Sequence, residues 1–110
     1  MNDKIVLNEV NNVGDRIHLY FNGLVGLYVA YGISAFLLAK ETEVSPSYSD
    51  DMQMPVAVIN AGHYDMLEQQ MEVLKKVENY RCLKAIAAFD ENEYTEWASQ
   101  LRGGRVAELT

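Results

Sequence analysis

The segment from residue 16 to residue 40 constrains the fold of this chain more than any other part of it. It reads RIHLYFNGLVGLYVAYGISAFLLAK, in which two apolar, aromatic-rich runs flank the dipeptide Asn22-Gly23. Asn-Gly is the strongest short-range signal for a β-hairpin, because both residues tolerate positive φ. The second run leads directly into a helical pattern that opens at Gly32 and Ser34. We therefore expect two antiparallel strands followed by a helix.

The rest of the chain alternates between strand-like and helix-like patterns. Strands are predicted over 54–59 and 80–89, and helices over 63–77 and 91–101, from the period of their apolar residues. The order β-β-α-β-α-β-α predicts an α/β (α+β) protein, with a mixed β-sheet and helices packed on it. Residues 4–10, before the hairpin, fit either an edge strand or a helical turn.

The length of 110 residues predicts a single domain over 1–110. A polar loop at 41–53 is expected to be flexible. The pair Gly103-Gly104 is expected to end the last helix and to leave a loose tail over 102–110. No apolar run is long enough to cross a membrane, the N-terminus lacks a secretory signal pattern, and Cys82 is the one cysteine. These features predict a cytoplasmic protein that does not contact membranes.

The negative charge of the chain is concentrated in one stretch. The formal net charge is −7 at pH 7, and residues 41–72 hold seven acidic residues and no lysine or arginine. Binding to a phosphate backbone requires lysine and arginine, so this stretch is poorly suited to contact DNA or RNA. We expect this stretch to form a solvated acidic face. The alternative is that it forms a docking site for a basic partner.

The residues LYVAYGISA, from Leu27 to Ala35, resemble the motif G-x-F-Y-E-x-[FY]-x-x-D-A in the N-terminal mismatch-recognition domain of the MutS DNA mismatch repair family. When these residues are laid on FYExYGxDA, a form of this motif, four positions fit: Tyr28, Tyr31, Gly32 and Ala35. The run MPVAVI resembles the proline-containing strand that follows in the family, and the layout agrees over residues 16–87. The resemblance implies the fold of that domain for this chain.

The same alignment also shows what this chain lacks. In the family, the Phe of the motif stacks on the mispaired base and the Glu hydrogen-bonds to it; the matching positions here are Leu27 and Val29. Leucine has no π-face for stacking, and the valine side chain cannot accept a hydrogen bond. The chain also contains no P-loop. The resemblance thus implies a non-catalytic module without the base reader, which acts through contacts with a protein partner or through self-association.

Tyrosines around the predicted hairpin provide the candidate interface. If Tyr20 and Tyr28 face outward on adjacent strands, they form with Tyr31 an exposed aromatic patch of the kind that marks interfaces. The alternative is that these rings pack in the core and at its edge. The alternative function is nucleic-acid binding through a C-terminal basic surface, which would comprise Lys75, Lys76, Arg81, Lys84, Arg102 and Arg105.

No strong pattern for catalysis or metal binding is present in the sequence. His18 and His63 are the two histidines, and nothing in their spacing brings them together with carboxylates. Asp90 followed by Glu93 is typical of a helix N-terminus. We therefore expect no catalytic residues, no metal, no cofactor and no small-molecule ligand, and a nucleic acid is not the expected partner.

Overall fold

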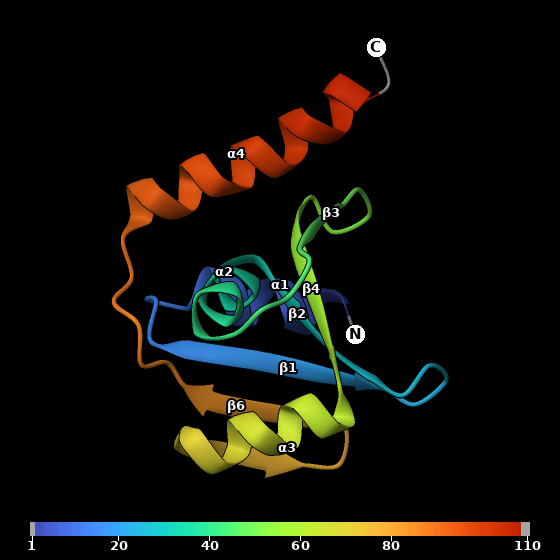
Figure 1. Cartoon of the computed structure of the whole chain (residues 1–110), viewed down its shortest axis with the longest axis vertical. Coiled ribbons are helices and arrows are strands. Elements are labelled where there is room, and N and C mark those ends of the chain that lie inside the picture. The colour runs from blue at the N-terminus through green and yellow to red at the C-terminus, as the bar shows by residue number, and fades with distance from the viewer. Residues whose placement is uncertain (1, 109–110) are drawn as a thin grey trace.

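The structure is a computed structural model that describes residues 2–108, with the side chains of residues 3–103. These residues form helices and strands in the order α-β-β-α-β-β-α-β-β-α (Figure 1). The elements are α1 (Asn2–Val10), β1 (Arg16–Asn22), β2 (Leu27–Tyr31), α2 (Gly32–Glu41), β3 (Ser47–Ser49), β4 (Met54–Asn60), α3 (Ala61–Gln70), β5 (Val73–Val77), β6 (Tyr80–Lys84) and α4 (Glu91–Glu108).

The six strands form one sheet in the order β3-β4-β2-β1-β6-β5. The α/β class, with helices packed on a sheet, is confirmed. The prediction of a mixed sheet is wrong for the described residues, because every neighbouring pair of strands is antiparallel. The pairs β1–β2, β3–β4 and β5–β6 are also consecutive in the chain and are joined by short connections, which suits antiparallel pairing.

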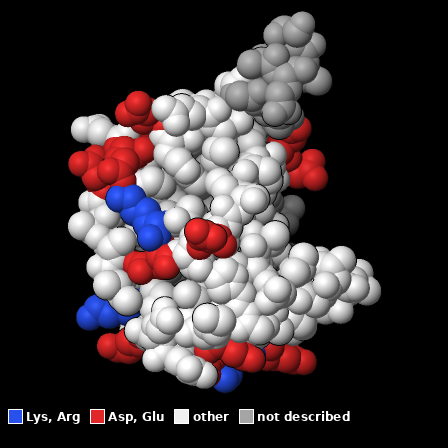
Figure 2. All heavy atoms as spheres, viewed as in Figure 1, with Lys and Arg blue, Asp and Glu red and all other residues white. Residues whose placement is uncertain are grey.

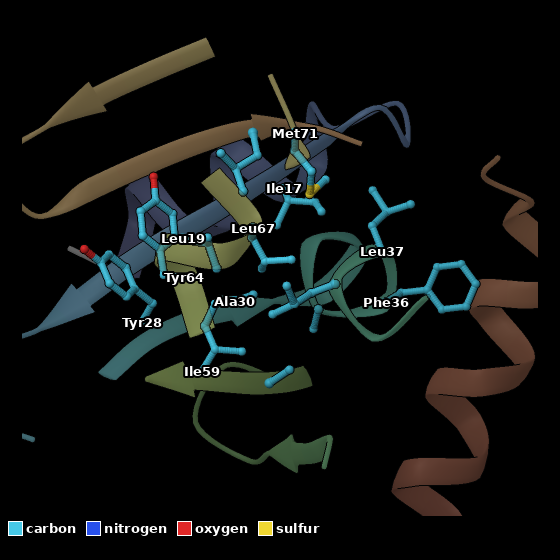
Figure 3. Packing of buried hydrophobic residues seen from close by; sticks show 14 residues of the cluster. Ile17, Leu19, Tyr28, Ala30, Phe36, Leu37, Ile59, Tyr64, Leu67 and Met71 are labelled. Atoms are coloured by element: carbon cyan, nitrogen blue, oxygen red, sulfur yellow. The ribbon is translucent and has the colours of Figure 1, made fainter. Parts of the chain in front are cut away.

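One face of the sheet, here called the inner face, carries the hydrophobic core. Its buried side chains pack against α2 and against Tyr64 and Leu67 of α3 (Figure 3). They include Ile17, Leu19, Tyr28, Ala30 and Ile59. Helix α2 contacts both β1 and β4 and lies in the angle that the twisted sheet makes between them (Figure 1). The other face is here called the outer face, and α1 lies beside it, with Asn8 on Tyr20 and Lys4 on Tyr80.

Helix α4 is attached to the rest of the molecule by aromatic rings. Phe36 of α2 makes edge-to-face contacts with Phe89, Tyr94 and Trp97, at centroid distances of 5.2–6.0 Å. The expected N-cap is present, since the Asp90 carboxylate accepts a hydrogen bond from the backbone N of residue 93 at 3.0 Å. The pair Gly103-Gly104 does not end the helix, which continues to Glu108. The predicted loose tail is therefore helical over 102–108, and residues 109–110 lie outside the described part.

The prediction of one helix over 63–77 is wrong in its second half. Helix α3 ends at Gln70, and residues 73–77 form the edge strand β5, which pairs with β6. A β-bulge between Val73 and Lys75 inserts an extra residue. The bulge breaks the two-residue alternation, so the apolar positions of β5 also fit a helical period.

Three further boundaries differ from the predicted ones. The segment 4–10, left open between strand and helix, belongs to helix α1. The polar loop 41–53 contributes the short strand β3, which pairs with β4. The strand predicted over 80–89 ends at Lys84, and the following segment leaves the sheet toward α4.

The predicted hairpin is present, but its loop is longer than an Asn-Gly turn. The Asn22 carbonyl accepts a hydrogen bond from Gly26 N at 2.9 Å, and the Asn22 side chain accepts one from Leu24 N at 3.1 Å. The left-handed residue is Gly26, with φ of 68°. The loop therefore spans residues 23–26, and β2 begins at Leu27.

We expect Asn60→Ala to lower the free energy of unfolding by about 1 kcal/mol, the usual effect of removing an N-cap. The Asn60 side chain accepts a 2.7 Å hydrogen bond from His63 N at the first turn of α3. Urea unfolding would measure the change. The control is Asn92→Ala, which replaces an exposed asparagine on α4. Equal stability of the two variants would contradict the capping role.

Candidate functional site

One row of side chains crosses the outer face of the sheet from β4 to β5. The register places Val58, Val29, Tyr20, Tyr80 and Val77 opposite one another on five neighbouring strands. All five are at least partly exposed, and at the two ends Val58 is 44% and Val77 48% exposed. None of them carries a charge at neutral pH. These five residues are called the outer row below.

The loop of the β1–β2 hairpin adds two exposed apolar side chains beside the outer row. Leu24 is 97% and Val25 61% exposed. Figure 2 shows that the loop projects from the body of the protein and that no acidic or basic side chain lies on it. Leu27, the first residue after the loop, faces the same side as Val29, because alternate residues of a strand share a face. Leu24 and Val25 are called the hairpin tip below.

The predicted aromatic patch is divided between the two faces of the sheet. Tyr20 and Tyr31 lie on the outer face with ring centroids 6.3 Å apart, whereas Tyr28 is buried on the inner face and stacks on Tyr64 at 4.5 Å. Tyr28 pairs with the residue after Tyr20, so the strand alternation separates them. The expectation that Tyr20, Tyr28 and Tyr31 share one patch is wrong. The outer ring beside Tyr20 is Tyr80, at 5.5 Å.

Hydrogen bonds hold the two tyrosines of the outer row in place. Asn8 of α1 donates to the Tyr20 hydroxyl at 2.9 Å, and the Tyr80 hydroxyl lies 2.5 Å from His18 Nδ1. Burial lowers the pKa of His18, so the neutral imidazole can accept a hydrogen bond from the Tyr80 hydroxyl. Burial also raises the pKa of Tyr20 to about 12 and raises that of Tyr80. Both hydroxyls stay protonated and bonded, which leaves the rings themselves for contact.

A cavity of about 390 Å³ lies at the β5 end of the outer row. Its walls are three outer-row residues, a lysine of α1 and the β5–β6 turn: Tyr20, Val77, Tyr80, Lys4, Glu78 and Asn79. The Lys4 ammonium lies 5.8 Å from the centroid of the Tyr80 ring, within the range of a cation–π contact. The cavity thus combines aromatic walls with one cation and one anion.

The basic residues proposed for nucleic-acid binding do not gather on one surface. The β5–β6 register puts Lys76 and Arg81 on the inner face of the sheet and Lys75 and Lys84 on the outer face. Arg102 lies on α4. Lys76 bonds to Glu68 at 3.0 Å, and the Arg81 guanidinium lies over the rings of Tyr28 and Tyr64. The side chain of Arg105 lies outside the described residues. The geometry does not favour the alternative function.

The two histidines are engaged in different parts of the fold. His18 faces Tyr80, as described above, while His63 Nε2 lies 2.5 Å from Thr42 Oγ1 and links the start of α3 to the end of α2. Cys82 is buried on β6. Over the described side chains, no three residues among His, Cys, Asp and Glu are grouped closely enough to hold a metal ion.

Glu9 is a buried carboxylate that the sequence analysis did not single out. It accepts hydrogen bonds from the backbone N of Ser34 at 3.0 Å and from the Ser34 hydroxyl at 2.5 Å, at the first turn of α2. Burial raises the pKa of Glu9 to about 7, although the bonds from Ser34 and Asn12 act in the opposite direction. The sequence did contain a sign that Glu9 is buried. Glu9 follows Ile5, which is buried, by four residues, so the two share one face of the helix. Glu9 joins α1 to α2.

The sequence analysis also missed Val58, Val77 and Tyr80 as members of one surface. Their alignment depends on which strands are neighbours, and β5 was not predicted as a strand. No known family model matches this chain, and neither a curated protein nor a solved structure does. Within the described residues, no helix is both long enough and apolar enough to span a membrane.

Proposed function

We propose that this protein is a non-catalytic module that acts through protein–protein contacts, made by the outer row and the hairpin tip. The observation that carries the proposal is the row of uncharged, at least partly exposed side chains across five strands. The helices leave this face partly uncovered, with Val58, Val77 and the tip residues exposed. Contiguous apolar surface of this kind marks interaction sites on soluble proteins.

The resemblance to the mismatch-recognition domain supports the same reading. Leu27 and Val29, which align with the base-reading Phe and Glu, both belong to β2 and face the outer side. Val29 is the centre of the outer row, between Tyr20 and Val58. In this proposal, two aliphatic side chains stand where the family has its base-reading residues, and they form an apolar contact surface on a similar scaffold.

A second copy of the chain is the occupant that we propose for this surface. The chain has a net charge of −7, but neither the outer row nor the hairpin tip carries any of it. Two copies can therefore meet there without placing carboxylates directly against each other. The β1–β2 hairpin projects from the body of the protein (Figures 1 and 2). A projecting apolar tip suits a two-fold contact in which each copy places its tip against the outer row of the other.

The test is the mass in solution, measured by light scattering after size exclusion at about 10 µM and about 500 µM, concentrations that bracket a weak dimer. We expect the mass to rise toward that of two chains at the higher concentration. Val58→Glu and Leu24→Glu should each weaken self-association at least about tenfold, because each buries a carboxylate against apolar side chains.

The matched control is Met66→Glu, which places the same charge at a 59% exposed apolar position on α3, on the inner side of the sheet. This variant should associate as the unmodified protein does. A single-chain mass at both concentrations would overturn the proposal. So would an equal loss of association in Met66→Glu and Val58→Glu, since the outer row would then have no special role.

A further inference from the structure

We propose that the cavity between α1 and the β5–β6 turn binds a planar aromatic anion, whose ring lies against Tyr20 and Tyr80 and whose carboxylate or phosphate pairs with Lys4. The volume of about 390 Å³ falls within the range of small-molecule sites. This inference concerns a ligand, and it does not depend on the identity of the protein partner.

The aromatic walls of the cavity are fixed before a ligand arrives. The hydroxyl of Tyr20 is held by Asn8 and that of Tyr80 by His18, so neither ring is free to collapse into the space. The two ring centroids lie 5.5 Å apart at an interplanar angle of 45°, and Val77 adds an aliphatic surface. A flat ring can stack on one tyrosine and meet the edge of the other, which are the favoured arrangements of aromatic pairs. Pre-formed walls reduce the entropy lost on binding.

The charges around the cavity select the sign of the ligand. Lys4 makes a contact with the Tyr80 ring, and no carboxylate lies within ion-pair distance of it among the described side chains. Its ammonium is therefore available to a carboxylate or phosphate. Glu78 also lines the cavity and repels an anion. The anionic group of a bound ligand is thus directed toward α1, and the uncharged ring toward the tyrosines.

The experiment compares three probes by calorimetry and by backbone amide shifts: indole-3-acetate, adenosine monophosphate and tryptamine. Indole-3-acetate and tryptamine carry the same ring with opposite charge, and adenosine monophosphate supplies a phosphate in place of the carboxylate. We expect a Kd of about 1 mM for indole-3-acetate, as the size of the probe implies. Changes in backbone amide chemical shift should be confined to α1 and to residues 77–80. Tryptamine should bind at least fivefold more weakly.

Variants identify the groups that hold the ligand. Lys4→Gln should weaken binding of the anion about fivefold, the usual effect of one partly exposed ion pair. The matched control is Lys40→Gln, since Lys40 also lies over an aromatic ring, that of Phe36, outside this cavity. Lys40→Gln should leave binding unchanged.

Binding of either anion at this cavity supports the inference, and their relative affinity tells a carboxylate ligand from a phosphate ligand. Absence of shifts with both anions at 10 mM would overturn it, as would tighter binding of tryptamine or an unchanged affinity in Lys4→Gln. The titration is repeated in Val58→Glu, which keeps the cavity but alters the contact surface. Loss of self-association in this variant with retained binding is the result that both proposals predict. A single-chain mass of the unmodified protein with retained binding would count against the proposed function alone, whereas absent binding in both proteins would count against the ligand site alone.

Discussion

Replacing Gly14 by alanine is expected to lower the free energy of unfolding by about 3 kcal/mol and the Tm by roughly 12 °C. Gly14 has φ of 96°, and a Cβ atom placed there would lie 2.2 Å from the ring of Phe89. The left-handed backbone costs an alanine about 1 kcal/mol, and overpacking adds about 2 kcal/mol. Phe89 cannot move away freely, because it packs on the core through Phe36. Urea and thermal unfolding would measure the loss.

The control for this prediction separates backbone strain from the steric clash. Gly26 also has positive φ, 68°, but no atom lies within 4 Å of the position of its Cβ. Gly26→Ala should therefore cost only about 1 kcal/mol, from the backbone alone. In a Gly14→Ala, Phe89→Ala double variant, Gly14→Ala should cost no more than Gly26→Ala, because the ring is gone. If Gly14→Ala were as stable as Gly26→Ala in the unmodified background, the close packing of Phe89 on Gly14 would be disproved.

The parts of the fold that could be predicted are those in which local chemistry and burial agree. The β1–β2 hairpin, the start of α2 at Gly32, the β4 strand and the N-cap at Asp90 follow from turn residues, proline and capping residues. These signals are short in range, and tertiary packing does not oppose them. The class of the fold followed from their order along the chain.

The errors occurred where burial gives no periodic signal. Strand β5 is an edge strand, exposed from Leu74 to Val77, and its bulge displaces the alternation. An exposed strand of this kind cannot be told from the end of a helix by its apolar residues alone. At the C-terminal end of α4, Gly103-Gly104 did not end the helix. Glycine makes a helix less favourable by about 1 kcal/mol per residue, but it can still adopt helical φ and ψ.

The candidate site depended on these same errors. Tyr20 and Tyr31 were singled out from the sequence, but their partner Tyr80 could be found only once β6 was known to lie beside β1. Tyr28 was grouped with them although strand alternation separates it from Tyr20. A two-residue turn and the observed four-residue loop differ by two residues, so both place Tyr20 and Tyr28 on opposite faces of the sheet.

We further expect the stability of the protein to depend on the protonation of Glu9. The folded-state pKa of Glu9 is raised from 4.5 to about 7, chiefly by burial, so the folded state holds this proton more tightly than the unfolded state does. The stabilisation that the folded state gains from holding the Glu9 proton is fully present below pH 4.5 and is lost as the pH rises through about 7. It amounts to about 3 kcal/mol between these limits. Glu9→Gln removes the titration while it keeps the shape of the side chain.

The measured quantity is the difference in free energy of unfolding between the unmodified protein and Glu9→Gln, at pH 4.5 and at pH 8. We expect this difference to change by about 3 kcal/mol in favour of Glu9→Gln at the higher pH. The comparison cancels the opposite effect of His18, whose lowered pKa favours folding as the pH rises toward 6.5. The uncharged groups that face Glu9 are Ser34 and Asn12, and its charge also acts on the hydroxyls of Tyr20, Tyr80 and Tyr94.

Glu96→Gln is the control, because it neutralises an exposed glutamate on α4 without touching the link between α1 and α2. Its stability relative to the unmodified protein should be nearly independent of pH. A difference between Glu9→Gln and the unmodified protein that is the same at pH 4.5 and pH 8 would show that Glu9 titrates alike in the folded and unfolded states. The carboxylate would then be hydrated in solution, and the bonds from Ser34 could not be what holds α1 against α2.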